Sequence, residues 1–174
     1  MLFLMEEKAK EILRKAKYWV FDGTFEKCPA PFKQVYTIVA VFPDLPERQK
    51  SFICGIVFAS NKTQSTYEEI FQRLKEELDG DIGVTPKEFR FDHEMAAIQS
   101  ARAEFPDAEI LTCNFHYTRN LGDYARSSKC SVNLYADPGF QRWLRALMGS
   151  SHLPSEWQVF YFIFRLLFLY SFFF

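Results

Sequence analysis

The stretch KYWVFDGTFEKC, from Lys17 to Cys28, places one acidic residue, Asp22, inside a run of aromatic and β-branched side chains. Such a run is typical of a β-strand, and alternation along the strand places Asp22 on the opposite face from Trp19 and Phe21. A carboxylate within a central strand is costly unless it is solvated or binds a cation. Asp22 is therefore the first candidate functional residue.

Two further strand-like runs follow, QVYTIVAVF over residues 34–42 and SFICGIVFAS over residues 51–60, and proline-containing loops separate the runs. Because the loops are short, these two runs and residues 18–25 are expected to form a three-stranded antiparallel meander. A short charged helix over residues 5–17 is expected before the meander.

Helices and strands alternate in the next part of the chain. Apolar residues recur every three or four positions between residues 61 and 78 and predict an amphipathic helix, which Ser65 and Glu68 begin with the spacing of a capping box. The pattern then predicts a strand over 87–92, a helix over 93–105, a strand over 108–115 and a helix over 116–127. Helices between strands imply parallel crossovers. The order β-β-β-α-β-α-β-α is that of a ribonuclease H-like α/β fold, with three antiparallel and then two parallel strands.

The composition is that of a folded chain, with 48% apolar and 25% charged residues and a net charge of −1. It excludes a disordered chain. The four cysteines lie far apart and follow no secretory signal, so a reducing compartment is expected. We expect an N-terminal helix or linker over residues 1–16, one domain over residues 17–150, and a separate segment over residues 151–174.

The segment WQVFYFIFRLLFLYSFFF, from Trp157 to Phe174, has ten aromatic residues in 18 positions and one charge, Arg165. Its length is marginal for a membrane helix, and a central arginine costs ~3 kcal/mol on insertion scales. No membrane contact is expected, and we interpret the segment as the start of a helical insertion or as a truncated, aberrant end.

A second acidic residue, Asp92, ends the strand over residues 87–92. In this fold order that strand lies beside the first one, so Asp22 and Asp92 are expected to be neighbours at one edge of the sheet. Adjacent carboxylates repel unless a cation neutralises them. Mg²⁺ or Mn²⁺ is the natural cation, because carboxylates and substrate phosphates together complete its coordination. The alternative is that Asp22 caps a turn before Gly23 and that Asp92 caps the next helix.

Four stretches together resemble the catalytic core of Mutator-like element (MULE) transposases. They are DGTF at residues 22–25, FASNKTQSTYEEIF at 58–71, FDHEMAAIQSARAEFPDAEI at 91–110 and CNFHYTRNL at 113–121. The resemblance covers about residues 17 to 150 in collinear order.

This resemblance implies a DDE-type transposase, which cuts and joins DNA at transposon ends with two divalent metal ions. It implies that Asp22 is the first catalytic acid and metal ligand, that Asp92 is the second, and that Cys113 and His116 are the family's CxxH pair. DNA is the implied partner and the nucleus the implied location, and a homo-oligomer is a further option.

Cys113 and His116 also have the spacing of half a zinc site, which Cys130 and His152 would have to complete. Those spacings match no standard zinc finger. The sequence favours His116 as the opening residue of a helix near the active-site edge, where it hydrogen-bonds a substrate phosphate. Glu94 lies two residues after Asp92, and one option is a role in the family's site. The simpler expectation is an exposed acid in the first turn of its helix, where its charge favours the helix dipole.

Basic residues gather toward the end of the expected domain. Residues 113–150 carry five basic and two acidic side chains, a net charge of +3. This stretch is either an ordinary mixed surface or a patch that faces DNA phosphates, and Arg119, Arg126 and Lys129 are the candidate DNA contacts.

One departure from the family pattern concerns catalysis. The family's third acid, a glutamate on a helix after a long insertion, has no match here, and Glu156 matches only the start of that insertion. We therefore expect that the intact family protein cleaves DNA and transfers strands, and that these 174 residues alone do not. The alternative is a domesticated, non-catalytic module that binds protein or DNA.

Overall fold

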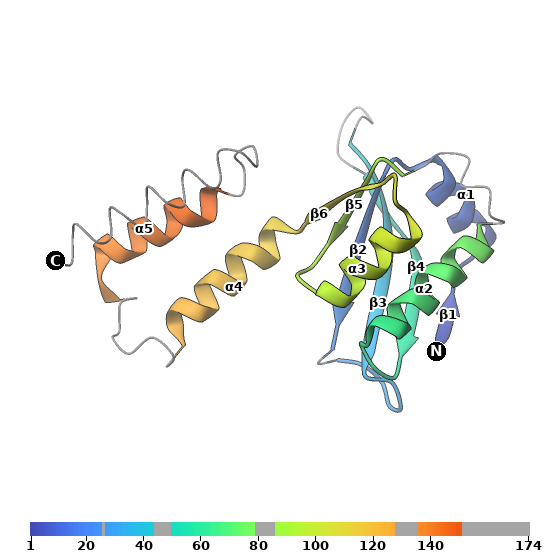
Figure 1. Cartoon of the computed structure of the whole chain (residues 1–174), viewed down its shortest axis with the longest axis horizontal. Helices are drawn as coiled ribbons and strands as arrows, with labels where there is room; N and C mark the ends of the chain where they lie inside the picture. The colour runs from blue at the N-terminus through green and yellow to red at the C-terminus, as the bar shows by residue number, and fades with distance from the viewer. Residues whose placement is uncertain (26, 44–49, 79–85, 128–135, 151–174) are drawn as a thin grey trace. The chain divides into compact units, whose positions relative to one another are not determined.

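The structure is a computed structural model, and it describes residues 1–25, 27–43, 50–78, 86–127 and 136–150. The chain divides into two compact units, Met1–Cys113 and Asn114–Phe174. Figure 1 labels the described strands and helices of both units.

In the described part of the first unit, six strands form one mixed sheet. They are β1 (Leu2–Leu4), β2 (Tyr18–Thr24), β3 (Gln34–Phe42), β4 (Lys50–Ala59), β5 (Glu88–Phe91) and β6 (Glu109–Thr112), in the spatial order β1-β4-β3-β2-β5-β6. The pairs β1–β4, β4–β3 and β3–β2 are antiparallel, whereas β2–β5 and β5–β6 are parallel. The predicted antiparallel meander and the two parallel strands that follow it are confirmed.

Strand β1 was not expected from the sequence. It has three residues, two of them exposed leucines, and it becomes a strand by pairing with Ile56–Phe58 of β4. Three residues are too few to show a hydrophobic period, so no local pattern predicts this strand.

Three helices pack against one face of the sheet: α1 (Glu7–Lys15), α2 (Gln64–Glu77) and α3 (Met95–Glu104). Figure 1 shows α2 and α3 in front of the strands. Leu13 of α1, Ile70 of α2 and Ala97 of α3 join the same buried cluster as Trp19 and Phe21 of β2. The residues that alternate with these two on β2 are only partly buried. The predicted alternation of β2 is therefore confirmed.

Aromatic rings fill the core between the helices and the centre of the sheet. The rings of Trp19 and Phe89 stack with centroids 5.1 Å apart. The rings of Phe21 and Phe91 stack 4.8 Å apart and are inclined by only 4°. Both pairs join β2 to β5, where the parallel register places Trp19 opposite Phe89 and Phe21 opposite Phe91. Stacked rings contribute more stability than their buried area alone provides, so these two pairs favour this register over a shifted one.

The expected capping box of Ser65 and Glu68 is wrong. Helix α2 begins at Gln64 with Thr63 as its N-cap, so Ser65 already lies inside the helix. The Asn61 side chain organises the turn instead, because its Oδ1 accepts hydrogen bonds from the Thr63 backbone N–H, 3.2 Å away, and from the Thr63 hydroxyl, 3.0 Å away. The turn before the helix therefore sets where the helix begins.

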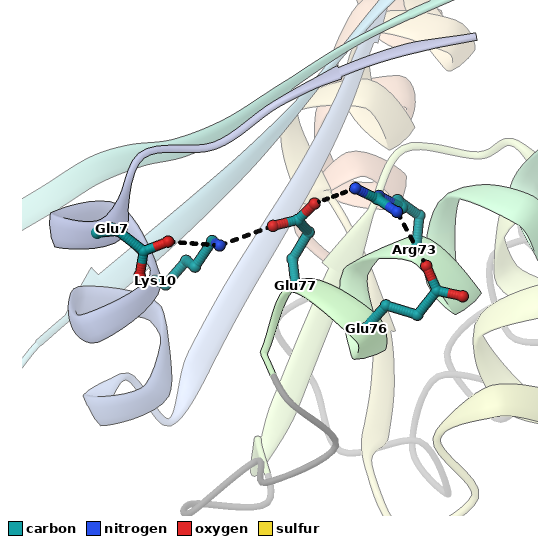
Figure 2. Close-up of polar contacts among 5 residues, drawn as sticks. All are labelled: Glu7, Lys10, Arg73, Glu76 and Glu77. Atoms are coloured by element: carbon teal, nitrogen blue, oxygen red, sulfur yellow. Dashed lines mark hydrogen bonds and ion pairs between the residues drawn. The ribbon is translucent and has the colours of Figure 1, made fainter.

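An ion-pair network joins α1 to α2 (Figure 2). Lys10 of α1 lies 2.7 Å from Glu7 and 2.7 Å from Glu77 of α2, measured from Nζ to the carboxylate oxygens. Arg73 contacts Glu77 at 2.6 Å and Glu76 at 3.1 Å. The hydrogen bond from Lys10 is the main reason that the pKa of Glu77 lies below its ordinary value. This network holds the N-terminal helix beside the core.

The second unit contains α4 (Asn114–Arg126) and α5 (Pro138–Gly149) among its described residues. Ala125 of α4 packs with Phe140 and Leu144 of α5. Helix α5 was not expected from the sequence, although it has clear start signals: Pro138 opens it, and the Asp137 carboxylate accepts a hydrogen bond of 2.7 Å from the Phe140 N–H.

Within the described ranges, no helix combines the length and apolar character needed to cross a membrane. The predicted aromatic segment over residues 151–174 and the prediction for Glu156 lie outside the described residues. The expected single domain over residues 17–150 stays a prediction.

Candidate metal and DNA site at the ends of β2 and β5

Asp22 lies in the second half of β2, next to the end of the strand, and its side chain is partly exposed. It pairs with Thr37 of β3, whose hydroxyl donates a hydrogen bond of 3.2 Å to the Asp22 backbone carbonyl. Its neighbour Phe21 is 1% exposed and faces the helices. Because side chains alternate along a strand, the Cβ atom of Asp22 lies on the face of the sheet that α1, α2 and α3 do not cover.

Asp92 follows the last residue of β5 and precedes α3. Phe21 pairs with Phe91 in the parallel register, so the next residues along the two strands are Asp22 and Asp92. The expected placement of the two strands side by side is confirmed. One Asp92 oxygen, Oδ1, accepts a hydrogen bond of 3.1 Å from the Glu94 backbone N–H at the start of α3.

The other Asp92 oxygen reaches Gly23. A Cβ atom at Gly23 would lie 3.7 Å from Asp92 Oδ2, 3.4 Å from Cδ2 of Tyr36 and 3.4 Å from Cζ of Phe25. These are ordinary van der Waals distances, so the three groups surround the Gly23 Cβ position without excluding a small side chain. Tyr36 pairs with Gly23 and is buried, so a buried phenol ring and the Asp92 carboxylate both lie near the Cβ position of Gly23.

Glu94 differs from its expected role as an exposed first-turn acid. Its side chain is 22% exposed and forms an ion pair with Lys62, with Nζ and Oε2 separated by 3.3 Å. Lys62 comes from the loop between β4 and α2, and its ammonium lies 4.9 Å from the centroid of the Phe25 ring. A partly buried carboxylate needs a cation nearby, and the fold supplies one from 32 residues away in the sequence.

Sequence reasoning missed Lys62 as a residue of this site. The motif NKT that contains it was recognised, and a lysine between a strand and a helix was the available signal. Lys62 and Asp92 lie far apart in the sequence, so no local pattern indicated that both residues belong to the same end of the sheet.

Negative charge gathers at this end of the sheet. The pKa of the Tyr36 hydroxyl lies well above its ordinary value, first because of burial, then because of Tyr67, and then because of the charges of Asp92, Asp22 and Glu94. The pKa of Tyr67 is also raised, by burial first and then by Glu94 and Asp92. Asp92 and Glu94 therefore act on both buried phenols, whereas Asp22 acts on Tyr36.

The family model of the MULE transposase domain matches residues 18–120. The chain belongs to the MULE transposase family. The matched range begins with the first residue of β2 and ends within α4, so it contains both Asp22 and Asp92. A comparison with curated proteins gives no match.

Divalent metal use is general among such transposases, and the carboxylates of this chain partly fit it. Among the described residues, no group of three or more His, Cys, Asp or Glu side chains could hold a metal ion. Asp22 and Asp92 are nevertheless neighbours, and Mg²⁺ is commonly held by one or two carboxylates together with water and substrate phosphates. The catalytic and metal-binding roles of these two residues stay predictions.

The predicted CxxH pair divides between the two units, because Cys113 ends the first unit and His116 belongs to the second. Cys113 is a free cysteine whose backbone N–H donates a hydrogen bond of 2.6 Å to the Phe91 carbonyl, and His116 lies in the first turn of α4. Cys130 and His152, the candidates to complete a zinc site, lie outside the described residues. The zinc alternative and the phosphate contact of His116 stay predictions.

The predicted DNA contacts lie on α4 or after it. Arg119 and Arg126 are exposed, and both form ion pairs with Asp123, at 3.7 Å and 2.7 Å. Lys129 lies outside the described residues. Asp123 offsets part of the basic charge of α4, so the DNA-binding role of these residues also stays a prediction.

Proposed function

We propose that this protein is a ribonuclease H-like, DDE-type MULE transposase domain in which Asp22 and Asp92 hold a divalent metal ion of the kind with which DDE transposases cleave DNA and transfer strands. The observation that supports the proposal is the parallel register of β2 and β5, which makes the two aspartates neighbours at the carboxyl ends of central strands. In open α/β sheets, sites commonly form at these ends.

Each residue of the site has a distinct part in this proposal. Asp22 and Asp92 supply oxygen ligands of the kind that Mg²⁺ and Mn²⁺ prefer. The Glu94 N–H holds Asp92 Oδ1 and so orients the carboxylate. Lys62 has three ammonium donors and is 60% exposed, so it can contact a DNA phosphate while it pairs with Glu94. When bound, the metal ion would activate the attacking oxygen and stabilise the leaving oxygen at phosphorus.

The first test measures Mn²⁺ affinity by electron paramagnetic resonance of the free ion. We expect Asp22→Asn and Asp92→Asn each to weaken Mn²⁺ binding at least tenfold, because an amide lacks the ligand charge. Asp107→Asn is the matched control, because Asp107 is exposed and follows α3 outside the site. Equal Mn²⁺ affinity in all four proteins, with native circular dichroism, would contradict the proposal.

The second test measures binding to duplex DNA of arbitrary sequence at several salt concentrations. If Arg119 and Arg126 neutralise phosphates, the slope of log K against log salt should fall by about 0.9 for each arginine replaced by alanine. Arg102→Ala is the control, because Arg102 is an exposed arginine on α3. Unchanged slopes would exclude these two contacts. DNA binding in a chain that binds no Mn²⁺ would support the alternative, a domesticated DNA-binding module.

A further inference from the structure

Phe25 is an exposed aromatic residue beside the candidate metal site. It follows the last residue of β2, and its side chain is 39% exposed, whereas the aromatic rings of the sheet core are almost fully buried. Its Cζ atom lies 3.4 Å from the Cβ position of Gly23, and Asp92 Oδ2 lies 3.7 Å from the same position. The ring and a candidate metal ligand therefore flank one residue at the end of the sheet.

Lys62 places a cation against this ring. Its ammonium lies 4.9 Å from the centroid of the Phe25 ring and 3.3 Å from Glu94 Oε2, and its side chain is 60% exposed. An ammonium over a ring is attracted to the electron-rich face of that ring. One ammonium covers at most one of the two faces, so part of the ring still meets solvent. Phe25 and Lys62 thus offer an aromatic surface and a positive charge side by side.

Hydrogen bonds hold the loop that carries Lys62. Gln34 is fully buried, and its amide donates a hydrogen bond of 2.9 Å to the Asn61 carbonyl. The Tyr67 hydroxyl donates one of 3.1 Å to the side-chain oxygen of Gln34. The Asn61 side chain accepts one of 3.2 Å from the backbone N–H of Thr63, on the other side of Lys62. Such preorganisation lowers the entropy that is lost when a side chain binds a ligand.

An unpaired nucleotide has the chemistry that matches this pair. Its base has free π-faces, which neighbouring bases cover in a duplex, and its phosphate is negative. Proteins commonly bind single-stranded nucleic acid with aromatic side chains that stack on bases and basic side chains that contact the backbone. One exposed phenylalanine is ordinary on a protein surface. Phe25 differs from Phe52, which is 40% exposed, because a cation and a candidate metal ligand lie beside its ring.

We propose that Phe25 stacks on an unpaired DNA base beside the candidate metal site, and that Lys62 contacts the phosphate of that nucleotide or of its neighbour. This inference rests on the proposed function, because it takes DNA as the substrate. It adds the form of the DNA, a strand in which one base has left the duplex stack. Stacking then holds this nucleotide close to Asp92.

The test measures the affinity of the full chain for two fluorescent oligonucleotides of equal length, one of thymidines and one of abasic sites. The assay contains Mg²⁺, because Asp22, Asp92 and Glu94 repel a phosphate when no cation is bound. We expect the wild-type chain to bind the thymidine strand at least fivefold more tightly than the abasic strand. Phe25→Ala should remove this preference without weakening the abasic complex, and Phe25→Trp should retain the preference.

Two controls separate stacking from charge and from a general effect of lost aromatic surface. Phe52→Ala should change neither affinity, because the strand pairing places Phe52 at the opposite end of the sheet from Phe25. Lys62→Ala should weaken both complexes. It should also make the slope of log K against log salt less steep by about 0.7, the value for one phosphate contact on a single strand.

The outcomes separate this inference from the proposed function. A preference for thymidines that Phe25→Ala retains, or an equal loss on both strands, would overturn the stacking role and leave the proposed metal site unaffected. Equal binding of both strands by a wild-type chain that binds Mn²⁺ would have the same meaning. A wild-type chain that binds no Mn²⁺ would contradict the proposed function, and the stacking role that rests on it would fail as well.

Discussion

The stacked rings of Phe21 and Phe91 directly precede the two aspartates of the candidate site. Phe21 is 1% exposed and Phe91 is 0% exposed, and their parallel rings join β2 to β5. We predict that this pair stabilises the register on which the adjacency of Asp22 and Asp92 depends. The perturbation is a double-mutant cycle that contains Phe21→Leu, Phe91→Leu and the variant with both changes.

The expected magnitudes follow from burial and from ring contact. Replacement of a buried phenylalanine by alanine costs about 3–5 kcal/mol, and leucine keeps most of the buried carbon, so each single change should cost roughly 1–2 kcal/mol. An aromatic pair contributes about 0.5–1.5 kcal/mol beyond its buried area. The loss of unfolding free energy in the double variant should therefore be about 0.5–1.5 kcal/mol smaller than the sum of the two single losses. The reason is that the second change removes a ring contact that the first change has already broken. Contacts of either ring with Phe71 and Phe89 cancel in the cycle.

The assay is urea unfolding followed by far-ultraviolet circular dichroism, with the same m-value required of all variants. Phe32 and Phe58 form the control pair, since their rings lie 5.5 Å apart at 41° and both side chains are partly exposed. Their coupling should be smaller than that of Phe21 and Phe91. A coupling below about 0.3 kcal/mol for Phe21 and Phe91 would refute the reasoning, because it lies within the range of independent sites.

Three further predictions concern stability. Tyr67→Phe should lower the free energy of unfolding by about 1–3 kcal/mol, because it leaves the buried Gln34 oxygen without its donor; an unchanged Tm would contradict this. The hydrogen bond from Lys10 lowers the pKa of Glu77, so wild type should be more stable than Glu77→Gln when Glu77 is ionised. This difference in the free energy of unfolding should be complete above the unfolded-state pKa of about 4.3. It should vanish as the pH falls through the lower folded-state pKa. Urea titrations between pH 3 and 7 measure this difference, and one that stays constant over the range would exclude the linkage. Asp137→Ala should destabilise α5 by about 1 kcal/mol through loss of its N-cap, whereas Asp137→Asn should keep most of that stability; equal melts by circular dichroism would argue against the cap.

Local sequence patterns predicted most of the element types and the face that β2 buries. The alternation around Trp19 and Phe21 predicted the buried side of β2, and short proline-containing loops predicted the antiparallel meander. The positions of Asp22 and Asp92 near strand ends followed from the same patterns. Such features depend on neighbours within a few residues, because the period of a strand or a helix and the chemistry of a turn are local properties.

Only the tertiary structure decided which distant residues share the candidate site. The pairing of β1 with β4, the ion pair of Lys62 with Glu94, and the approach of Asp92 to Tyr36 across Gly23 each join segments far apart in the chain. No local pattern distinguishes Tyr36 from any other tyrosine that faces inward from a strand. The sheet register places Gly23 opposite Tyr36, and Asp92 Oδ2 lies 3.7 Å from the Gly23 Cβ position. Contacts of this kind depend on how several elements pack together, and that packing is a property of the whole fold rather than of any one segment.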